Sequence, residues 1–369
     1  MLTRLYVDNF RCLVNFELRL DRVNLLLGEN GTGKTTVFEV LHRLQQFLGG
    51  SAKMTTLFPV KDLTRWQTIG LQRFEMDLKL EQGAYTYSLL VEHDEDRRKN
   101  RIKEEKLLMD GRPLFEFKDG TAQLYHDDFK LGPQYPFDWS QSGVGSLQPR
   151  PDNKKLTRFR NEVGKFVIAG PCPMLMSSQS DHEEDTLSRW MENFVSWYRH
   201  VSQEHQGSML ALFQELKKVL PGFSEFSLKP SGEDTRVLKV FFERPGGQGK
   251  SLPYDFSEVS DGQRVLIALY ALVFGLKDEG LYLFLDEPDN YVALREIQPL
   301  LTAVTDSCGE GVEQAVMISH HPEIIDYLAN SSGRWFDRDG TGPARVSDKP
   351  KAAVEGLNLS EGMARGWVS

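Results

Sequence analysis

The sequence predicts an α/β fold in which a mixed parallel sheet is flanked by helices and carries an antiparallel β lobe and a helical insertion. Three observations predict this class. The near-continuous apolar run Val23–Leu27 is typical of a strand buried on both faces, and a helical pattern follows it. The same order returns near the C-terminus, where the apolar run Leu281–Leu285 precedes helical spacing over 294–304. Between these segments, residues 74–91 alternate with period two, which indicates antiparallel strands.

The N-terminal segment is expected to supply two strands before the first buried one. Apolar and polar residues alternate over 2–10, and a second strand is expected over 16–20. After Val23–Leu27 comes a glycine-rich turn over 28–33. Apolar residues at helical spacing then place a helix from about Thr35 onward.

The middle of the chain changes character. Residues 74–80 and 85–91 alternate on either side of a Gln-Gly turn and predict a hairpin. Asp110-Gly111 and Asp119-Gly120 mark further turns of the β lobe. Residues 131–155 are rich in Pro, Gly, Ser and Gln and are expected to form a loop.

The second half of the chain is expected to alternate helices and strands. Helical spacing predicts a helix over 187–201, whose aromatic residues belong in the core, and another over 209–220. A strand is expected over 237–242, a helix over 265–276, and a further buried strand over 315–318.

Composition and charge exclude several classes of protein. The chain has 369 residues, with 44 Lys and Arg against 53 Asp and Glu, and the net charge of −9 argues against coating nucleic acid through bulk positive charge. The longest apolar run, Val265–Leu276, is shorter than the roughly 20 residues of a membrane span, and no secretory signal is visible. The three separated cysteines indicate neither a disulfide framework nor a zinc site. We therefore expect a cytoplasmic protein with no membrane contact.

A complete phosphate-binding motif follows the first buried strand. Residues Gly28–Thr35 fit G-x-x-x-x-G-K-[ST], with the strand before and the helix after that the motif requires. The alternative is a glycine-rich turn that fits the motif by chance, and such a turn would need neither the strand before it nor the helix after it. The glycines let backbone N–H groups point at phosphate oxygens, and the helix N-terminus adds a positive end. We expect Lys34 to reach the β- and γ-phosphates and Thr35 to ligate Mg²⁺.

A pair of acids ends the buried strand Leu281–Leu285. A strand in a parallel sheet delivers a carboxylate at its C-terminal end, where phosphate loops also lie. Asp286 suits the Mg²⁺ shell, and Glu287 suits polarising the attacking water. The alternative is a plain acidic strand-to-turn pair.

Ser260–Arg264 comes directly before the apolar helix expected over 265–276. This segment resembles the signature of ABC-type ATPases, usually Ser-Gly-Gly-Gln, with Asp261 in place of one glycine. The resemblance implies that Ser260 caps the helix and that its N–H groups face a γ-phosphate across a dimer interface. A simple helix N-cap is the alternative.

Val316–Pro322 resembles the switch-histidine strand of the same ATPases, which implies that His320 senses the γ-phosphate. Surface or metal-binding histidines are the alternative for the pair His320-His321. The four motifs in this order resemble the ABC-type ATPase heads of RecF, SMC proteins and OLD-family nucleases.

The opening Leu5–Leu13 resembles the first strand of this family. Two further segments, 286–298 and the ending 356–367, are similar to the OLD-like "predicted AAA ATPase" branch, many of whose members belong to bacterial anti-phage defence operons. OLD nucleases carry a Toprim nuclease domain, for which the segment after His320 is too short, so we expect none in this chain. No long coiled coil is expected either.

The resemblance implies an ABC-type, RecF-like P-loop head that uses ATP and Mg²⁺ as cofactors. It assigns catalysis to Lys34, Glu287 and His320, and the metal to Thr35 and Asp286. Two heads would sandwich ATP, as a homodimer or higher oligomer. The nucleotide would be bound by Gly28, Glu29, Asn30, Gly31, Thr32, Gly33, Lys34, Thr35, Thr36, Ser260, Gly262 and Gln263.

Domain organisation follows from the motif positions. An ATPase core is expected to be completed from both chain ends, by 1–60 and 235–369. The antiparallel β lobe is expected at 61–135, and the loop and helical insertion at 136–234.

Three functions are open. The leading hypothesis is a Mg²⁺-dependent ATPase switch that controls a separate effector protein, a nuclease or toxin, in bacterial anti-phage defence. The second is a RecF-like DNA-binding repair ATPase. The third is a self-contained metal-dependent nuclease, for which Asp127-Asp128 or His320-His321 would have to supply metal ligands.

Two basic stretches are candidates for DNA contact. The mixed charges around Arg97–Lys103 favour a solvated hairpin tip. A cleaner positive segment has Phe159 interleaved, as base stacking requires. Its basic residues are Arg150, Lys154, Lys155, Arg158 and Arg160.

Three more residues are assigned by analogy. Gln72 is a candidate for the family's glutamine loop, with a solvated strand residue as the alternative. Asn9 and Arg11 are expected near the nucleotide.

Overall fold

The computed structural model describes residues 1–94, 99–246, 249–350 and 358–365. Two compact units make up the chain. Unit 1 comprises Met1–Phe166, Ser332–Gly356 and Gly362–Ser369, and unit 2 comprises Val167–Ser331 and Leu357–Glu361. No described helix is long and apolar enough to cross a membrane.

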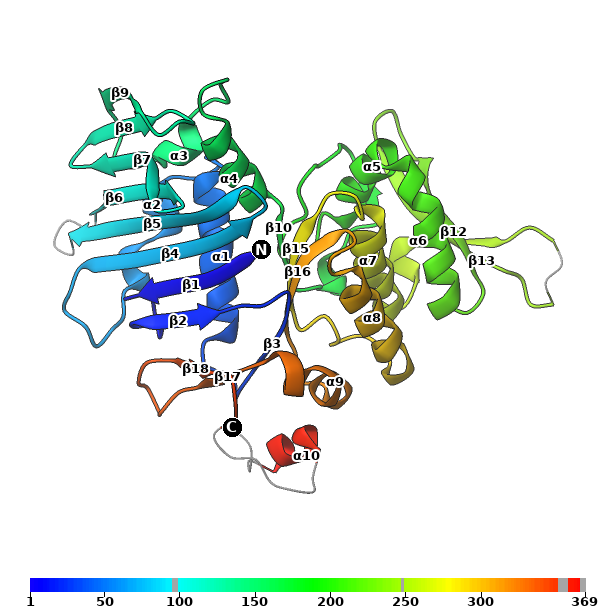
Figure 1. Cartoon of the computed structure of the whole chain (residues 1–369). Coiled ribbons are helices and arrows are strands. Elements are labelled where there is room, and N and C mark those ends of the chain that lie inside the picture. Colours follow the sequence, from blue (N-terminus) through cyan, green and yellow to red (C-terminus); the bar gives the residue numbers. More distant parts are fainter. Residues whose placement is uncertain (95–98, 247–248, 351–357, 366–369) are drawn as a thin grey trace. The chain divides into compact units, whose positions relative to one another are not determined.

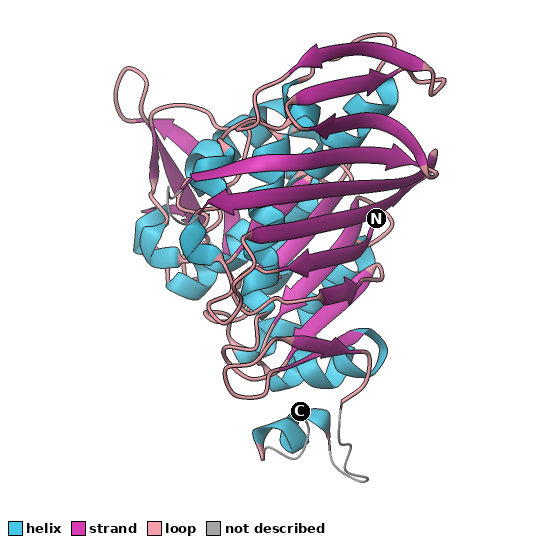
Figure 2. Ribbon diagram, turned by 90° about the vertical axis from the view of Figure 1, so that its left-hand side faces the viewer, coloured by secondary structure: helices cyan, strands magenta, loops and turns pink. Residues whose placement is uncertain are grey.

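Unit 1 contains an eight-stranded antiparallel sheet, the broad twisted layer in Figure 2. Its alternating sequence becomes alternating burial: in β4, Phe74 and Met76 are buried while Glu75 between them is partly exposed. The N-terminal strands β1 and β2 join the predicted hairpin, β4 and β5, in this one sheet. In spatial order the strands are β2 (Phe16–Arg19), β1 (Leu2–Asp8), β4 (Leu71–Leu80), β5 (Gly83–Asp94), β6 (Lys99–Met109), β7 (Arg112–Lys118), β8 (Thr121–Tyr125) and β9 (Leu131–Pro136).

Aromatic side chains join the helices of unit 1 to this sheet. Phe159 stacks on Tyr85 and Tyr87 of β5, with ring centroids 5.8 Å apart in both pairs. Phe58 lies between Phe47 and Phe74 of β4. Such pairs add to the free energy of apolar burial and fix the helices in register with the strands. The helices are α1 (Lys34–Leu48), α2 (Met54–Leu57), α3 (Gly143–Ser146) and α4 (Lys154–Gly164), with the short 3₁₀ turn η1 (Val60–Asp62).

Unit 1 also holds the strand that leads into the phosphate-binding motif. This strand, β3 (Val23–Leu27), pairs in parallel with β17 (Gly333–Asp337), which pairs antiparallel with β18 (Arg345–Ser347). A segment from far along the chain therefore lies directly beside the strand before α1.

Unit 2 is built around a helix that is apolar on all sides. Residues 265–273 of α7 are all buried, as expected for a helix inside a core. The parallel strands β15 and β16 pair with Leu285 opposite Met317. Further elements are β10 (Phe166–Ala169), η2 (Pro173–Leu175), β11 (Gln179–Ser180), α5 (Phe194–Glu204), α6 (Gln206–Val219), β12 (Phe223–Pro230), β13 (Arg236–Phe242), β14 (Leu252–Asp255), η3 (Phe256–Glu258), α7 (Asp261–Gly275), β15 (Leu281–Asp286), α8 (Leu294–Ser307), β16 (Val312–Ile318), α9 (Pro322–Ser332) and α10 (Leu359–Ala364).

Two predicted elements are wrong. The helix expected from Leu187 begins at Phe194, because Met191 has a φ of 56° and Asn193 ties the preceding turn together by accepting from the Ser188 N–H. Trp190 consequently lies outside the helix and is 45% exposed rather than in the core. The loop expected over 131–155 contains β9, α3 and the start of α4, and β12 was not predicted.

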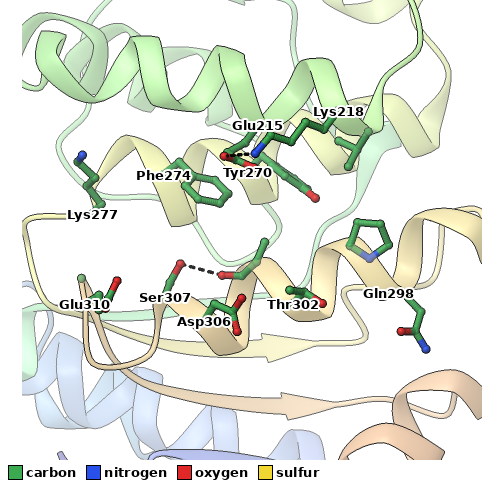
Figure 3. A pocket seen from close by; sticks show the side chains of 14 residues that line it. Glu215, Lys218, Tyr270, Phe274, Lys277, Gln298, Thr302, Asp306, Ser307 and Glu310 are labelled. Carbon is green, nitrogen blue, oxygen red and sulfur yellow. Dashed lines mark hydrogen bonds and ion pairs between the residues drawn. The ribbon is translucent and has the colours of Figure 1, made fainter.

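A cavity of ≈ 770 Å³ lies in unit 2 between α6, α7 and α8 (Figure 3). Tyr270 and Phe274 line it from α7, and the Lys218–Glu215 ion pair of 2.7 Å lies at its α6 side. Burial raises the pKa of Tyr270 to about 12, so its hydroxyl is protonated at neutral pH. No residue of the four motifs lines this cavity.

Candidate functional site

The glycine-rich turn after β3 has a backbone that only glycine accommodates. Gly28 has a φ of 138°, and a Cβ there would lie 2.2 Å from the Phe336 carbonyl oxygen of β17. Gly33 precedes α1 with a φ of 105°. The Thr32 hydroxyl donates to the Glu29 carbonyl at 2.8 Å and closes the turn. The sequence thus forms the tight loop that the motif predicts.

Lys34 points back into this loop. Its ammonium donates to the Gly28 and Glu29 carbonyls at 2.7 and 2.9 Å, and the residue is only 6% exposed. Thr35 is exposed and Thr36 half-buried in the first turn of α1. The loop therefore presents a fixed positive charge beside the positive N-terminal end of a 15-residue helix, which is an anion-binding arrangement.

The loop is braced by the segment after β17, which the sequence did not indicate. Arg338 donates to the Gly31 carbonyl at 3.1 Å and also to the Gly342 carbonyl at 2.7 Å. The Ala344 N–H donates to the Cys12 carbonyl at 2.9 Å, and a Cβ on Gly33 would lie 3.0 Å from Cys12 Sγ. No local motif predicts the Arg338–Gly31 and Ala344–Cys12 contacts, because each joins residues more than 300 positions apart.

In unit 2, the acidic pair ends β15 at a sharp turn. Glu287 has a φ of 50°, uncommon for a residue with a side chain, and its N–H donates to the Ile318 carbonyl at 2.9 Å. The Asn290 amide donates to Glu287 Oε2 at 2.6 Å and orients the carboxylate. Backbone strain of this kind gathers at functional sites.

Asp289 is a further acid of this turn that the sequence analysis assigned no role. It is 8% exposed, is hydrogen-bonded by Ser319, and has one oxygen, Oδ1, without a partner. Burial raises the pKa of Asp289 above its usual value. Asp289 thus ties the acidic turn to the histidine loop, and its place two residues after Glu287 was the signal that could have indicated it.

The two histidines of that loop have different settings. The His321 N–H donates to Ser319 Oγ at 3.0 Å, and His321 Nδ1 accepts from the Glu323 N–H at 3.2 Å. His321 is therefore held in the loop, while His320 is exposed. The exposed position suits a residue that contacts a ligand outside the unit.

The signature-like segment caps α7. Ser260 Oγ accepts from the Gln263 N–H at 3.3 Å, and Gln263 Oε1 accepts from the Ser260 N–H at 3.1 Å, a complete capping box. Gly262 lies against the acidic turn, because a Cβ there would come 2.5 Å from the Tyr291 carbonyl oxygen. The cap and the acidic turn are thus in direct contact within unit 2.

Gly262→Ala is expected to destabilise unit 2 and to lower ATP turnover at least tenfold. The added Cβ meets a backbone atom that cannot move alone, so overpacking of about 1–3 kcal/mol follows. Urea unfolding and phosphate release measure the two effects. Gly207→Ala is the matched control, since a Cβ at that helical glycine meets nothing within 4 Å and should leave stability unchanged or raised. Equal behaviour of the two variants would contradict the close contact at Tyr291.

The residues expected near the nucleotide by analogy form a buried polar cluster in unit 1. Gln72 is fully buried, donates to the Asn9 carbonyl at 2.9 Å and contacts His93 Nε2 at 2.9 Å, so the alternative of a solvated strand residue is wrong. The Asn9 amide donates to the Leu71 carbonyl at 2.8 Å. These contacts give Gln72 and Asn9 a structural role.

Arg11 joins the first turn to α1. Its guanidinium donates to Asp62 at 2.9 Å and to both carboxylate oxygens of Glu39. Although burial alone would raise it, the pKa of Asp62 is lowered by the hydrogen bonds from Arg43 and Arg11. The ion pairs of this cluster hold η1 against α1, and they need the carboxylates in their charged form.

The stabilisation that neutral His93 gives unit 1 is expected to be lost as pH falls from about 6.5 to 4. Burial lowers the pKa of His93 to about 4, from 6.5, so in this window the unfolded chain binds a proton that the folded chain does not. The His93 contribution is complete above pH 6.5, and its loss is at most about 3 kcal/mol.

As pH falls from 7.5 to 5, the His93→Gln variant should become more stable relative to the parent, as measured by urea unfolding. Both proteins contain the other titrating groups, so the contributions of those groups to the pH dependence cancel in the comparison. Glu105 is one of them, since burial raises its pKa to about 7. His182→Gln, at a side chain 72% exposed, is the control and should keep the parent slope. An unchanged slope in His93→Gln would show that this histidine is not held neutral.

The oxygen donors of the motifs suit Mg²⁺. Asp286 offers a carboxylate and Thr35 a hydroxyl, and both are hard oxygen ligands. Among the described residues no group of three or more His, Cys, Asp or Glu could hold a metal.

The basic segment on α4 is largely used within unit 1. Phe159 is fully buried, so its expected role in stacking on bases is wrong. Lys155 donates to the Asp127 carbonyl, and Arg160 to the Gly145 carbonyl at 3.2 Å. Arg150, Lys154 and Arg158 are exposed.

The other basic stretch lies at the β5–β6 connection. Arg97 and Arg98 lie outside the described residues. Arg101 and Lys103 pair with Glu92 at 2.6 and 3.1 Å, as expected for a solvated hairpin with mixed charge.

Comparison with known proteins finds a family model and a relative that match parts of this chain. Residues 1–109 match the family described as AAA ATPase domain. The DNA replication and repair protein RecF of Shewanella loihica is 33% identical over 86 residues, covering 20% of this chain and 24% of that protein. The chain thus matches about a quarter of that relative's length.

The head of an SMC protein, solved bound to the C-terminal winged-helix domain of ScpA, has a similar fold. The match covers 94% of this chain and 97% of that chain, with a TM-score of 0.59 and 12% identity. The predicted ABC-type α/β head fold is therefore confirmed. The match of residues 1–109 to the AAA ATPase domain family indicates a P-loop ATPase, while the expected domain boundaries and site residues stay predictions.

Proposed function

We propose that this chain is a Mg²⁺-dependent ATPase switch in which two heads close on ATP and control a separate effector protein. One observation carries the proposal: four motifs, in the order known from ABC-type heads, occur in a chain that matches an SMC head over 94% of its length. Phosphate release by the purified chain that requires Mg²⁺ tests the ATPase part. No release above a blank would overturn it.

Within one head, each residue has a distinct task. Lys34 and the loop amides bind the β- and γ-phosphates, and Thr35 and Asp286 would hold Mg²⁺. The bound metal supplies charge compensation at the phosphates. Glu287, oriented by Asn290 at 2.6 Å, accepts a proton from the attacking water, and His320 contacts the γ-phosphate.

The second head would supply the signature. The N-terminus of α7, capped by Ser260, presents N–H groups and a positive helix end to a γ-phosphate on the partner. Because Gly262 touches the acidic turn of its own head at Tyr291, this contact links the γ-phosphate bound by the partner to the residues that hydrolyse the other ATP. Loss of the γ-phosphate then releases the partner, an interface switch driven by nucleotide state.

The effector is proposed to be another chain, a nuclease or toxin of an anti-phage system, as the OLD-like resemblance implies. The residues considered for an internal nuclease support this. Asp127 accepts from the Lys154 and Lys155 N–H groups at the start of α4, and Asp128 pairs with Lys130 at 2.7 Å. Co-purification of the product of a neighbouring gene is the test, and a solitary gene counts against it.

A RecF-like role in DNA repair is the second candidate, favoured by the 33% identical segment of RecF. It predicts binding of duplex DNA that requires ATP and weakens with salt. Absence of such binding at low salt excludes it. Replacing Arg150, Lys154 and Arg158 together by alanine would test the exposed part of the basic segment.

A further inference from the structure

Arg189 lies beside the proposed metal carboxylate in unit 2. Its Nη2 is 3.7 Å from Asp286 Oδ2, and the side chains are only 16% and 11% exposed. Arg189 falls within the helix predicted over 187–201, and no motif of the sequence includes it.

The backbone holds Arg189 at this position. The Gly170 N–H, just after β10, donates to the Arg189 carbonyl at 2.8 Å. Gly170 itself lies against β15, since a Cβ there would be 3.2 Å from the Asp286 carbonyl oxygen. The irregular turn around Met191 thus presents the arginine to the end of β15.

The contact is a charge pair rather than an orienting hydrogen bond. A donor–acceptor distance of 3.7 Å exceeds the 2.7–3.2 Å of N–H···O bonds, so Arg189 does not fix the rotamer of Asp286. The guanidinium also lies over the Trp190 ring, 5.1 Å from its centroid. Arg189 therefore has a second favourable contact, which it can keep when it moves away from the carboxylate.

We propose that Arg189 is a counter-ion that competes with Mg²⁺ for Asp286 and so sets the Mg²⁺ concentration at which the head loads nucleotide. The proposal rests on the proposed function. A carboxylate that shares its charge with a guanidinium in a partly buried site attracts a cation less strongly. When Mg²⁺ binds, Arg189 leaves the carboxylate and shifts over the Trp190 ring. Arg189 is a positioning residue, since it acts through Asp286 and touches no substrate.

Mg²⁺ titration of nucleotide binding tests the competition without relying on turnover. A fluorescent ATP analogue is bound to the chain at fixed concentration, and the half-saturating Mg²⁺ concentration is measured. Arg189→Ala should lower this concentration on the order of tenfold. Arg189→Lys keeps the charge and should stay within about twofold of the parent, as should Arg295→Ala, whose side chain is 75% exposed on α8.

An unchanged or raised half-saturating concentration in Arg189→Ala overturns the proposal. A raised value would mean that the arginine orients the carboxylate for the metal. If the parent binds the analogue equally well without Mg²⁺, the counter-ion role fails while ATP binding stands. If the parent does not bind the analogue at all, the proposed function fails with it.

Trp190 provides an independent readout, because it is 45% exposed and in contact with the guanidinium. Its emission, taken as the difference between the parent and Trp190→Phe, should change on adding Mg²⁺ with nucleotide. The change should be absent in an Arg189→Ala background. An identical change in that background would overturn the movement of Arg189.

Discussion

Lys34→Ala is expected to reduce ATP turnover at least about a hundredfold and to weaken nucleotide binding. The ammonium lies inside the loop, on the Gly28 and Glu29 carbonyls, and is the fixed positive charge available to the β- and γ-phosphates there. Its removal also takes one donor from each of these two carbonyls, so the loop loses part of its preorganised shape. Steady-state phosphate release and binding of a fluorescent ATP analogue measure the two losses.

Lys53→Ala is the matched control, since Lys53 is an exposed lysine of the same unit outside the motif. It should turn over ATP at the parent rate. Normal hydrolysis by Lys34→Ala would show that the loop does not bind the transferred phosphate, and the proposed function would be wrong.

Glu287→Gln is expected to abolish hydrolysis while leaving ATP binding intact. Glutamine keeps the size of the side chain but cannot accept a proton from water, so the step after closure is blocked. Because ATP then persists, two heads should stay joined. Light scattering should report a dimer with Mg²⁺ and ATP, and a monomer or the resting oligomer with ADP.

The control for this variant is Glu313→Gln, at an exposed position on β16 of the same unit. It should hydrolyse ATP and show no lasting dimer. If Glu287→Gln keeps parent turnover, another residue activates the water, and Asp289, two positions on, is the first to examine.

Local signals in the sequence predicted the phosphate loop and the helix cap correctly. The loop needs positive φ at Gly28 and Gly33, and both glycines belong to one motif of eight residues. The capping box likewise depends only on Ser260 and Gln263. Such features form from neighbours along the chain, so periodicity and motif spacing are sufficient to predict them.

Contacts between distant segments could not be predicted in this way. Arg338 reaches the Gly31 carbonyl only because β17 pairs with β3, and nothing near residue 338 indicates that pairing. The sequence left open whether Gln72 belongs to the glutamine loop or is a solvated strand residue, and its inward position and contact with His93 follow from the strand pairing. Both contacts, Arg338 with Gly31 and Gln72 with His93, depend on which strands pair in the folded chain.

The unpredicted turn before α5 has a different cause. Helical spacing of apolar residues over 187–201 predicted a continuous helix, but Asn193 accepts from the Ser188 N–H and competes with the helical hydrogen bonds. Asparagine side chains favour such turns, and this one leaves Arg189 beside Asp286. Arg189 therefore reaches Asp286 because this turn replaces the start of the helix predicted over 187–201.

A mixing experiment tests the central claim, that each ATP is shared between two heads, most directly. Lys34→Ala damages the loop, and Ser260→Asp keeps a capping residue on α7 while placing a negative charge before the γ-phosphate. Each variant alone should be inactive. In a 1:1 mixture, half of the dimers carry one intact site, so about a quarter of the parent turnover should return. A mixture as inactive as its two components would contradict the sandwich and show that each head acts with its own signature or alone.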